Sequence, residues 1–319
     1  MYLYHHWHNL KDKYKNLVVG LGNFDGLHLG HQKLISEVVY MAEQLKGTTS
    51  IFTFHPHPLT VLNPDNSPPL LLSQESKQKL MAGMGIDLLL VVPFDLAFAG
   101  MSPTDFVRDV LYKGLGASAV VVGYNYTFGY RGRGTPELLQ DLSKIYGYQL
   151  KVIPPIKVDG KIVSSTLIRS LLLRGEVAEA AKFLGYYPFV EGPVVTGDKR
   201  GSSLLGFPTA NLDIDDSILV PSNGVYLAKA QIHGESYLAL ANIGVKPTFQ
   251  VQKRNIEVHL LDFCEDIYGE TIKVSFIRKI RDEKRFQTPA ELIKQIERDI
   301  LEARATWSEI KNKTKGNQI

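Results

Sequence analysis

The feature of this sequence that most limits its fold is a change in hydrophobic pattern near residue 186. Before that point, short apolar runs alternate with stretches of helical periodicity, which is typical of a parallel sheet covered by helices. After it, β-type runs recur with glycines between them, which favours an antiparallel barrel or sandwich. The chain is therefore predicted to form an α/β domain, residues 1–185, followed by a β domain, residues 186–319.

The predicted strands of the first domain are short and apolar on both faces, so they are expected to be buried. They are Leu17–Leu21, Ser50–Phe54, Leu88–Val92, Ala119–Val122 and Gln149–Ile153. A helix is expected over His31–Leu45, and two more begin at Ser102-Pro103 and Thr135-Pro136, where a hydroxyl N-cap precedes a first-turn proline. A short helical stretch, Thr166–Leu184, precedes the change in pattern.

The predicted strands of the second domain follow one another at a spacing of roughly ten to twenty residues with no helix between them, which favours antiparallel pairing. They are Val190–Val195, Gly224–Ile232, Tyr237–Ile243, Ile256–Phe263 and Thr271–Ile277. The segment Thr288-Pro289-Ala290-Glu291 resembles a capping box and predicts a final helix to about Trp307. The polar tail from Lys311 is expected to be frayed.

Composition excludes several classes of protein. The 319 residues are 44% hydrophobic and 22% charged, as in ordinary globular proteins. The 36 basic and 33 acidic residues are interleaved, which does not favour a nucleic-acid partner. The single cysteine, Cys264, is typical of a reducing compartment, and neither a signal peptide nor a membrane-spanning run is present. These features predict a cytoplasmic protein.

The segment Gly22–His31, GNFDGLHLGH, lies between the first predicted strand and the first helix, where parallel α/β sheets bind ligands. Its glycines allow backbone amides to approach phosphate oxygens, and the helix N-terminus adds positive partial charge. His28 and His31 are three residues apart and could donate hydrogen bonds to one triphosphate. The alternative is that these histidines only cap a helix and fill a turn. The predicted nucleotide contacts in this segment are Gly22, Asn23, Phe24, Asp25, Gly26, His28, Gly30 and His31.

This motif resembles the HxGH nucleotidyltransferase superfamily, and in its full form it resembles the N-terminal half of prokaryotic FAD synthetases. The resemblance implies that His28 and His31 are catalytic and that ATP is a substrate. It also implies nucleotide contacts from Asn125, which follows the fourth predicted strand, and from the similar S-S-T-x-I-R segment. The residues of that segment are Ser164, Ser165, Thr166 and Arg169.

One departure from the family pattern and a second histidine pair leave alternatives open. Ile162 stands where some members of the family have arginine, so a phosphate contact there would need Lys161 or another base. His55 and His57 follow the second predicted strand, but no further metal ligands lie near them in the sequence, so zinc is not favoured.

A second motif, Gly206–Leu212, reads GFPTANL. Thr209 and Asn211 are two residues apart on an extended segment, so both face the same way and could bind one hard cation. The alternative is an ordinary turn. The motif resembles that of riboflavin kinases, which implies that Gly206, Thr209 and Asn211 bind ATP and that Thr209 and Asn211 hold Mg²⁺. Ser202 replaces a basic residue that is usual after Gly201.

Glu257 stands alone among apolar neighbours in a predicted strand, and it faces the opposite side to Ile256 and Val258. By itself this pattern would indicate a solvent-facing residue. The resemblance to riboflavin kinases implies that Glu257 is catalytic and accepts the proton of the riboflavin 5'-hydroxyl.

Together the two motif sets extend from about Leu17 to Trp307 and resemble the bifunctional prokaryotic riboflavin kinase/FAD synthetase family. The resemblance implies a Rossmann-like adenylyltransferase domain joined to a six-stranded antiparallel β-barrel kinase domain with a terminal helix. Riboflavin and FMN would be phosphoryl and adenylyl acceptors, with FAD as the product. A cytidylyltransferase or another adenylyltransferase would suit the first motif alone, and a non-catalytic flavin-binding protein is a further alternative. We leave open whether the chain forms a weak homo-oligomer.

Overall fold

The computed structural model describes residues 1–196, 207–247 and 252–316. It contains two compact units, Met1–Ser165 and Thr166–Ile319, and each is described by itself. This division assigns the helical stretch before residue 186 to the second unit. The functional boundary at residues 185 and 186 stays a prediction.

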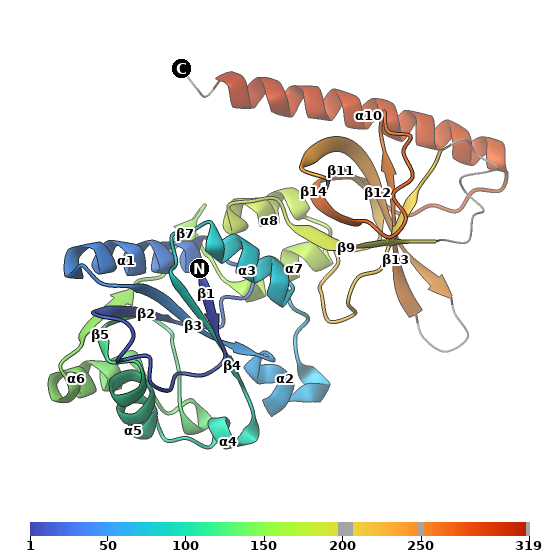
Figure 1. Cartoon of the computed structure of the whole chain (residues 1–319). Coiled ribbons are helices and arrows are strands. Elements are labelled where there is room, and N and C mark those ends of the chain that lie inside the picture. Colours follow the sequence, from blue (N-terminus) through green and yellow to red (C-terminus); the bar gives the residue numbers. More distant parts are fainter. Residues whose placement is uncertain (197–206, 248–251, 317–319) are drawn as a thin grey trace. The chain divides into compact units, whose positions relative to one another are not determined.

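The first unit is built on a six-stranded sheet in which every neighbouring pair is parallel, with the strand order β1-β4-β3-β2-β5-β6 (Figure 1). The strands are β1 (Tyr2–Tyr4), β2 (Leu17–Leu21), β3 (Thr49–His55), β4 (Leu88–Pro93), β5 (Ala117–Gly123) and β6 (Gln149–Ile153). All five predicted strands are present. The edge strand β1 was not predicted, because its three residues form a strand only through pairing with β4.

Helices cover both faces of this sheet, with α1 on one face and α5 and α6 on the other (Figure 1). The helices are α1 (Leu29–Leu45), α2 (Pro58–Leu62), α3 (Gln74–Ala82), α4 (Leu96–Ala99), α5 (Pro103–Asp105), its π-helical continuation η2 (Phe106–Gly114) and α6 (Pro136–Tyr146). Shorter elements are the 3-10 turns η1 (Pro64–Asn66) and η3 (Tyr130–Gly132) and the hairpin β7 (Lys157–Val158) and β8 (Lys161–Ile162). Buried apolar side chains of β2 and β5 pack against η2 and α6 and form a hydrophobic core on that face of the sheet.

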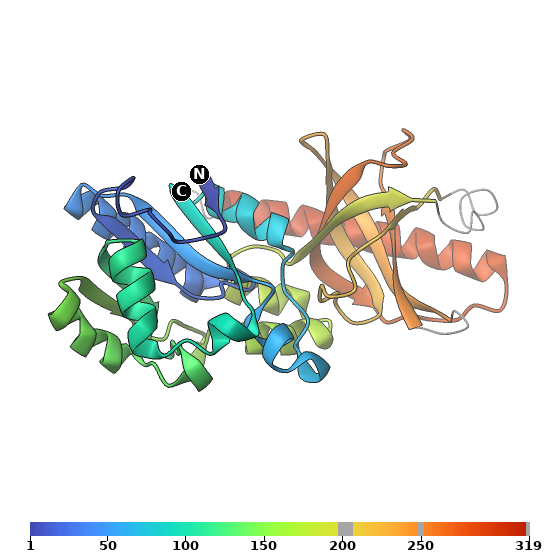
Figure 2. The same cartoon turned by 60° about the horizontal axis from the view of Figure 1, so that its bottom comes forward.

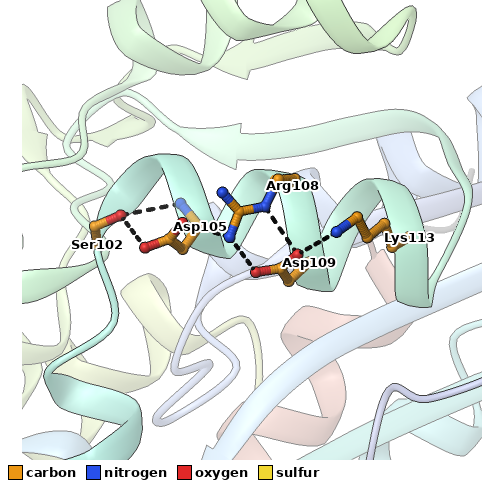
Figure 3. A network of polar contacts seen from close by, with 5 residues as sticks. All are labelled: Ser102, Asp105, Arg108, Asp109 and Lys113. Carbon is orange, nitrogen blue, oxygen red and sulfur yellow. Dashed lines mark hydrogen bonds and ion pairs between the residues drawn. The ribbon is translucent and has the colours of Figure 1, made fainter.

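The two predicted hydroxyl caps are confirmed. The Ser102 hydroxyl accepts the Asp105 backbone N–H at 3.1 Å, and the Thr135 hydroxyl accepts the Leu138 N–H at 3.4 Å. Beyond the Ser102 cap, Arg108 bridges Asp105 and Asp109, and Asp109 also pairs with Lys113 (Figure 3). The hydrogen bond from Arg108 and then that from Lys113 hold the pKa of Asp109 well below its usual range. Because these side chains are exposed, the network adds little to stability.

The second unit contains a closed six-stranded barrel with the strand order β10-β13-β12-β11-β14-β9, and all its neighbouring pairs are antiparallel. Its elements are α7 (Ser165–Leu173, which starts at the last residue of the first unit), α8 (Val177–Leu184), β9 (Phe189–Val195), β10 (Ala210–Leu212), β11 (Gly224–Ile232), β12 (Glu235–Pro247), β13 (Gln252–Leu260), β14 (Thr271–Arg281) and α10 (Pro289–Gly316). The structure thus confirms the barrel and excludes the sandwich.

The terminal helix α10 is longer than predicted. It continues past Trp307 to Gly316, so the predicted end near Trp307 was wrong, and fraying of the tail from Lys311 stays a prediction. The reason is tertiary, because Ile300, Ala303, Trp307 and Ile310 lie on one face of the helix and pack on an apolar cluster of the barrel. The helix lies along β12 and β14 (Figure 2). Within the described parts of the chain, no helix combines the length and apolarity needed to cross a membrane.

Candidate functional site

The Gly22–His31 segment lies at the carboxyl edge of the parallel sheet. β2 ends at Leu21, and the chain turns there and enters α1. The neighbouring strand β5 ends at Gly123, two residues before Asn125, which is exposed. Because β2 and β5 run parallel, their carboxyl ends meet, and the strand order reverses between them. The structure therefore brings the first motif and Asn125 to the switch point at which doubly wound sheets bind ligands.

The turn after β2 has an unusual backbone. Phe24 and Leu27 have φ angles of 53° and 37°, and both side chains are fully buried, which anchors the turn in the core. Gly26 has a φ angle of 81°, and a Cβ atom there would lie 2.6 Å from a Leu71 methyl group. Only glycine fits this position. Since the Phe24 side chain is inside the protein, any contact of Phe24 with a nucleotide would come from its backbone.

The two histidines of the motif stack on each other, with ring centroids 3.7 Å apart and an angle of 11° between the ring planes. His28 is the N-cap of α1, and its Nδ1 accepts the backbone N–H of His31 at 3.3 Å. When the His28 ring is neutral, its proton is consequently on Nε2. A Cβ atom at Gly30 would lie 3.2 Å from the His28 ring, so the glycine makes room for this stacking.

His31 is held in its neutral form. Burial lowers its pKa well below the usual value, and the nearby charges of His28 and Lys77 lower it further. Within the described part of the chain, its buried Nδ1 has no hydrogen-bond partner. An unsatisfied buried polar atom costs about 1–3 kcal/mol, so its presence in a motif indicates a site that a ligand completes.

Asp25 contacts protein rather than facing solvent. Its side chain is 6% exposed, and Oδ1 accepts the Leu71 backbone N–H at 2.9 Å. The Asp25 carbonyl accepts the Ser165 hydroxyl at 2.9 Å. These contacts tie the turn to the segment before α3 and to the start of α7. This structural role of Asp25 was not predicted from the sequence, and its contact with a nucleotide stays a prediction.

The S-S-T-x-I-R segment opens α7 and crosses the division between the two compact units. Ser165 belongs to the first unit and contacts the Asp25 turn, whereas Thr166 and Arg169 belong to the second. Their contacts with phosphate, and that of Ser164, stay predictions. Ile162 is exposed on β8 next to the equally exposed Lys161.

The second histidine pair lies at the end of β3 and the start of α2. The Nδ1 atom of His57 accepts the Leu59 backbone N–H at 3.2 Å and caps α2. His55 is the last residue of β3 and is exposed. Among the residues that the structure describes, no group of three or more His, Cys, Asp or Glu side chains could hold a metal ion. The capping role explains His57 without a ligand.

The candidate residues of the second site lie on three neighbouring strands of the barrel. Asn211 on β10 pairs directly with Glu257 on β13, and Glu257 pairs on its other side with Asn242 on β12. Directly paired residues of antiparallel strands have Cβ atoms about 4.5–5.5 Å apart and share a face. Ile256 and Val258 are buried, so Glu257 points away from the barrel core, as predicted.

Several polar contacts organise this face. The Asn255 side-chain amide donates to Glu257 Oε1 at 2.7 Å, and the His259 ring hydrogen-bonds the Pro208 carbonyl at 2.8 Å, just before Thr209. Asn242 and Asn255 were missed as site residues. Nothing in the local pattern distinguishes a strand asparagine, so Asn242 was not singled out. Gly206 and Ser202 lie outside the described residues.

Asn211 provides a test of the predicted cation site. Its Oδ1 atom is buried, and among the described residues it has no hydrogen-bond donor. Ala210 and Leu212 are buried on the other face, so Thr209 and Asn211 lie on the same side of the segment. A side-chain carbonyl without a donor next to a hydroxyl and a carboxylate fits a hard cation that prefers oxygen ligands. The arrangement therefore fits Mg²⁺.

Comparison with known proteins gives matches over both units. The family described as FAD synthetase matches residues 10–167, and the family described as riboflavin kinase matches residues 184–307. A bifunctional riboflavin kinase/FMN adenylyltransferase of Bacillus subtilis (strain 168) is 38% identical over 316 residues, covering 98% of this chain and 99% of the relative. The protein of the same description from Escherichia coli (strain K12) is 36% identical and covers 93% and 95%.

A solved structure has the same fold. It is described as a macrolide-efflux protein from Streptococcus pneumoniae, and it matches with a TM-score of 0.83 and 32% sequence identity. The match covers 91% of this chain and 94% of that protein. Both the parallel sheet and the barrel are thus shared with a crystal structure.

Proposed function

The chain belongs to the family of bifunctional riboflavin kinase/FMN adenylyltransferases, and from this premise we propose which of its residues carry each reaction. The riboflavin kinase part phosphorylates riboflavin to FMN with ATP, and the FAD synthetase part transfers the adenylyl group of a second ATP to FMN. The products of the second step are FAD and pyrophosphate.

For adenylyl transfer, a phosphate oxygen of FMN attacks the α-phosphorus of ATP, and the bond to the bridging oxygen breaks as pyrophosphate leaves. His28 and His31 stabilise the negative charge that develops on the leaving group. The observation that carries this assignment is the stacked pair itself, with a buried His31 Nδ1 that a phosphate oxygen would complete. Because burial keeps His31 neutral, it acts as a hydrogen-bond donor rather than as a fixed positive charge.

The remaining nucleotide contacts follow from the position of the turn. Gly22, Asn23, Phe24, Gly26 and Gly30 contact the nucleotide from the turn before α1 and from its first turn, where partial positive charge favours phosphate. Asn125 at the end of β5 contacts the nucleotide from the neighbouring strand. Ser164, Ser165, Thr166 and Arg169 at the start of α7 bind phosphate oxygens, and Arg169 does so with its planar guanidinium.

For phosphorylation, the riboflavin 5'-hydroxyl attacks the γ-phosphorus of ATP, and ADP leaves. Glu257 orients this hydroxyl and accepts its proton. The observation that carries this assignment is the direct pairing of Glu257 with Asn211 across β13 and β10. Thr209 and Asn211 would hold Mg²⁺, which when bound neutralises charge on the ATP phosphates. Gly206, at the start of the same motif, contributes a backbone contact to ATP.

We also propose that the enzyme works in the cytoplasm, with riboflavin, FMN and ATP as its small-molecule partners. Interleaved charges and a single cysteine support this setting. Mg²⁺ is the only cofactor that the proposal requires. No nucleic-acid or membrane partner is needed for either reaction.

The test is to incubate the purified chain with riboflavin, ATP and Mg²⁺ and to separate FMN and FAD by chromatography. FMN is expected first and FAD after it. Chelation of the metal should stop FMN formation, and Asn211→Ala should raise the Mg²⁺ concentration needed for half-maximal rate. An Asn211→Ala variant with unchanged Mg²⁺ dependence would remove Asn211 from the metal site.

A further inference from the structure

Lys77 is a buried charged residue that belongs to none of the motifs. It lies on α3, its side chain is 8% exposed, and its ammonium group donates to the Asn23 carbonyl at 3.3 Å. Asn23 is the second residue of the Gly22–His31 segment. An element more than forty residues further along the chain thus places a cation against the turn that leads into α1.

The charges around Lys77 come from the turn and from α1. Asp25 on the turn attracts the positive charge of Lys77. That charge lowers the pKa of His31 on α1, whose ring stacks on His28. Burial lowers the pKa of Lys77 to about 8, and Asp25 opposes this shift. On α3 itself, the neighbouring charged residues Glu75 and Lys79 are exposed. At neutral pH Lys77 is therefore mostly charged, although it is close to losing its proton.

This environment does not satisfy a buried ammonium group. An ammonium has three N–H donors, and among the described residues the Asn23 carbonyl is its one hydrogen-bond acceptor. The Asp25 carboxylate already accepts the Leu71 N–H through Oδ1. Burying a charge is costly unless an anion compensates it, and a neutral side chain could have held the Asn23 carbonyl without that cost. Asp25 supplies one negative charge nearby, and the remaining N–H donors of the ammonium group point to a further oxyanion that is bound there.

We propose that Lys77 is a further phosphate-binding residue of the adenylyltransferase site, in which α3 supplies a positive charge to the triphosphate of ATP. This inference rests on the proposed function of His28 and His31. The ammonium group offsets the negative charge that develops as the bond between the α-phosphorus and the bridging oxygen breaks and pyrophosphate leaves with the electron pair. Lys77 transfers no proton in this step. The histidines donate neutral hydrogen bonds, and Lys77 provides the charge that they lack.

The experiment uses the full chain with Lys77→Met and Lys77→Arg, and with Lys79→Met as the matched control on the exposed side of the same helix. FAD formation from FMN and ATP is measured for each variant, riboflavin phosphorylation by the same preparation is the control for the second unit, and a thermal melt reports on folding of the chain. Lys77→Met should lower kcat/KM for ATP about 10- to 100-fold, the range for a lost charge-assisted hydrogen bond. Lys77→Arg should keep most of the activity, and Lys79→Met should match the wild type.

The pH profile of FAD formation distinguishes a charged role of Lys77 from a purely structural one. Since the profile of kcat/KM reports groups of the free enzyme, wild-type FAD formation should fall as pH rises through about 8, where Lys77 loses its charge. An arginine stays charged there, so Lys77→Arg should lack this fall. Riboflavin phosphorylation should not show it in any variant.

Three results would overturn the inference. The first is wild-type kcat/KM for ATP in a folded Lys77→Met variant, and the second is the same alkaline fall in Lys77→Arg. If Lys77→Met does not fold, the pH profile of Lys77→Arg still tests the inference. The third is loss of both reactions in Lys77→Arg, which would make Lys77 purely structural. Failure of the His28 and His31 assignment would look different, because variants of those histidines would then form FAD at the wild-type rate.

Discussion

The two proposed sites of this enzyme are assembled in different ways. The adenylyltransferase site is centred on one continuous segment, Gly22–His31, whose shape comes from a buried turn with positive φ angles and from a histidine that caps α1. The kinase site is spread over Asn211, Asn242 and Glu257, which meet only because three strands of the barrel are in register. The comparison teaches that the first site depends on local backbone geometry and the second on strand pairing.

The largest effect expected from this comparison comes from removing both histidines. His28→Ala combined with His31→Ala should lower FAD formation by at least about 10³-fold, because fixed donors to a developing charge are each worth about 10²- to 10³-fold. FMN formation should stay nearly unchanged, since the barrel does not contain these residues. Rates of both reactions with chromatographic separation check this, and a thermal melt confirms folding. Loss of both products in a folded variant would mean that the sites are not independent.

The next largest effect concerns the proton acceptor of the kinase site. Glu257→Gln keeps the shape of the side chain but removes its basicity, so FMN formation should fall by about 10²-fold. We expect the lower end of the range for general bases because metal and positioning carry most of phosphoryl transfer. FAD formation from supplied FMN should be unchanged, and so should flavin and ATP binding. A parallel fall in FMN adenylylation would make Glu257 structural.

A smaller effect should come from the side chain that orients Glu257. Asn255→Ala removes the 2.7 Å hydrogen bond to Glu257 Oε1 and should slow FMN formation roughly tenfold, the value of one hydrogen bond to a charged group. The informative measurement is kcat in the double variant with Glu257→Gln. If Asn255 acts through Glu257, the second substitution should add little loss. If the kcat losses of the two single variants multiply fully in the double variant, Asn255 does not act through Glu257.

The smallest expected effect tests where the kinase domain begins. Fragments 166–319 and 186–319 should both phosphorylate riboflavin, because the barrel and α10 lie in each of them. The longer fragment should melt at least about 5 °C higher, a shift that corresponds to one or two kcal/mol in a domain of this size. It retains α8, with Phe183 buried, and the Leu172 carbonyl that accepts the Ser222 backbone N–H at 3.1 Å.

Calorimetry of the two fragments measures this difference directly. Equal melting temperatures would show that α7 and α8 add no stability to the barrel. An insoluble 186–319 fragment beside a soluble 166–319 fragment would move the boundary of the kinase domain to the division between the compact units.

The sequence alone determined what depends on local physics. Strands appear where short apolar runs predicted them, and Ser102 and Thr135 cap their helices, because periodicity and capping involve neighbours a few residues apart. The first motif was recognisable for the same reason, since its glycines and histidines are contiguous. The role of Glu257, by contrast, came from the resemblance, because an isolated strand carboxylate has no local signal of function.

Only the tertiary structure decided which distant residues meet. The three-residue strands β1 and β10 exist through pairing with longer strands, and α10 continues to Gly316 because Trp307 and Ile310 pack on the barrel. Asn242 was not recognised because strand register, which no local pattern encodes, sets it beside Glu257. Lys77 was missed for a related reason. α3 packs against the turn at Asn23 and buries the ammonium group of Lys77 there. Burial removes the water that would hydrogen-bond an ordinary surface lysine.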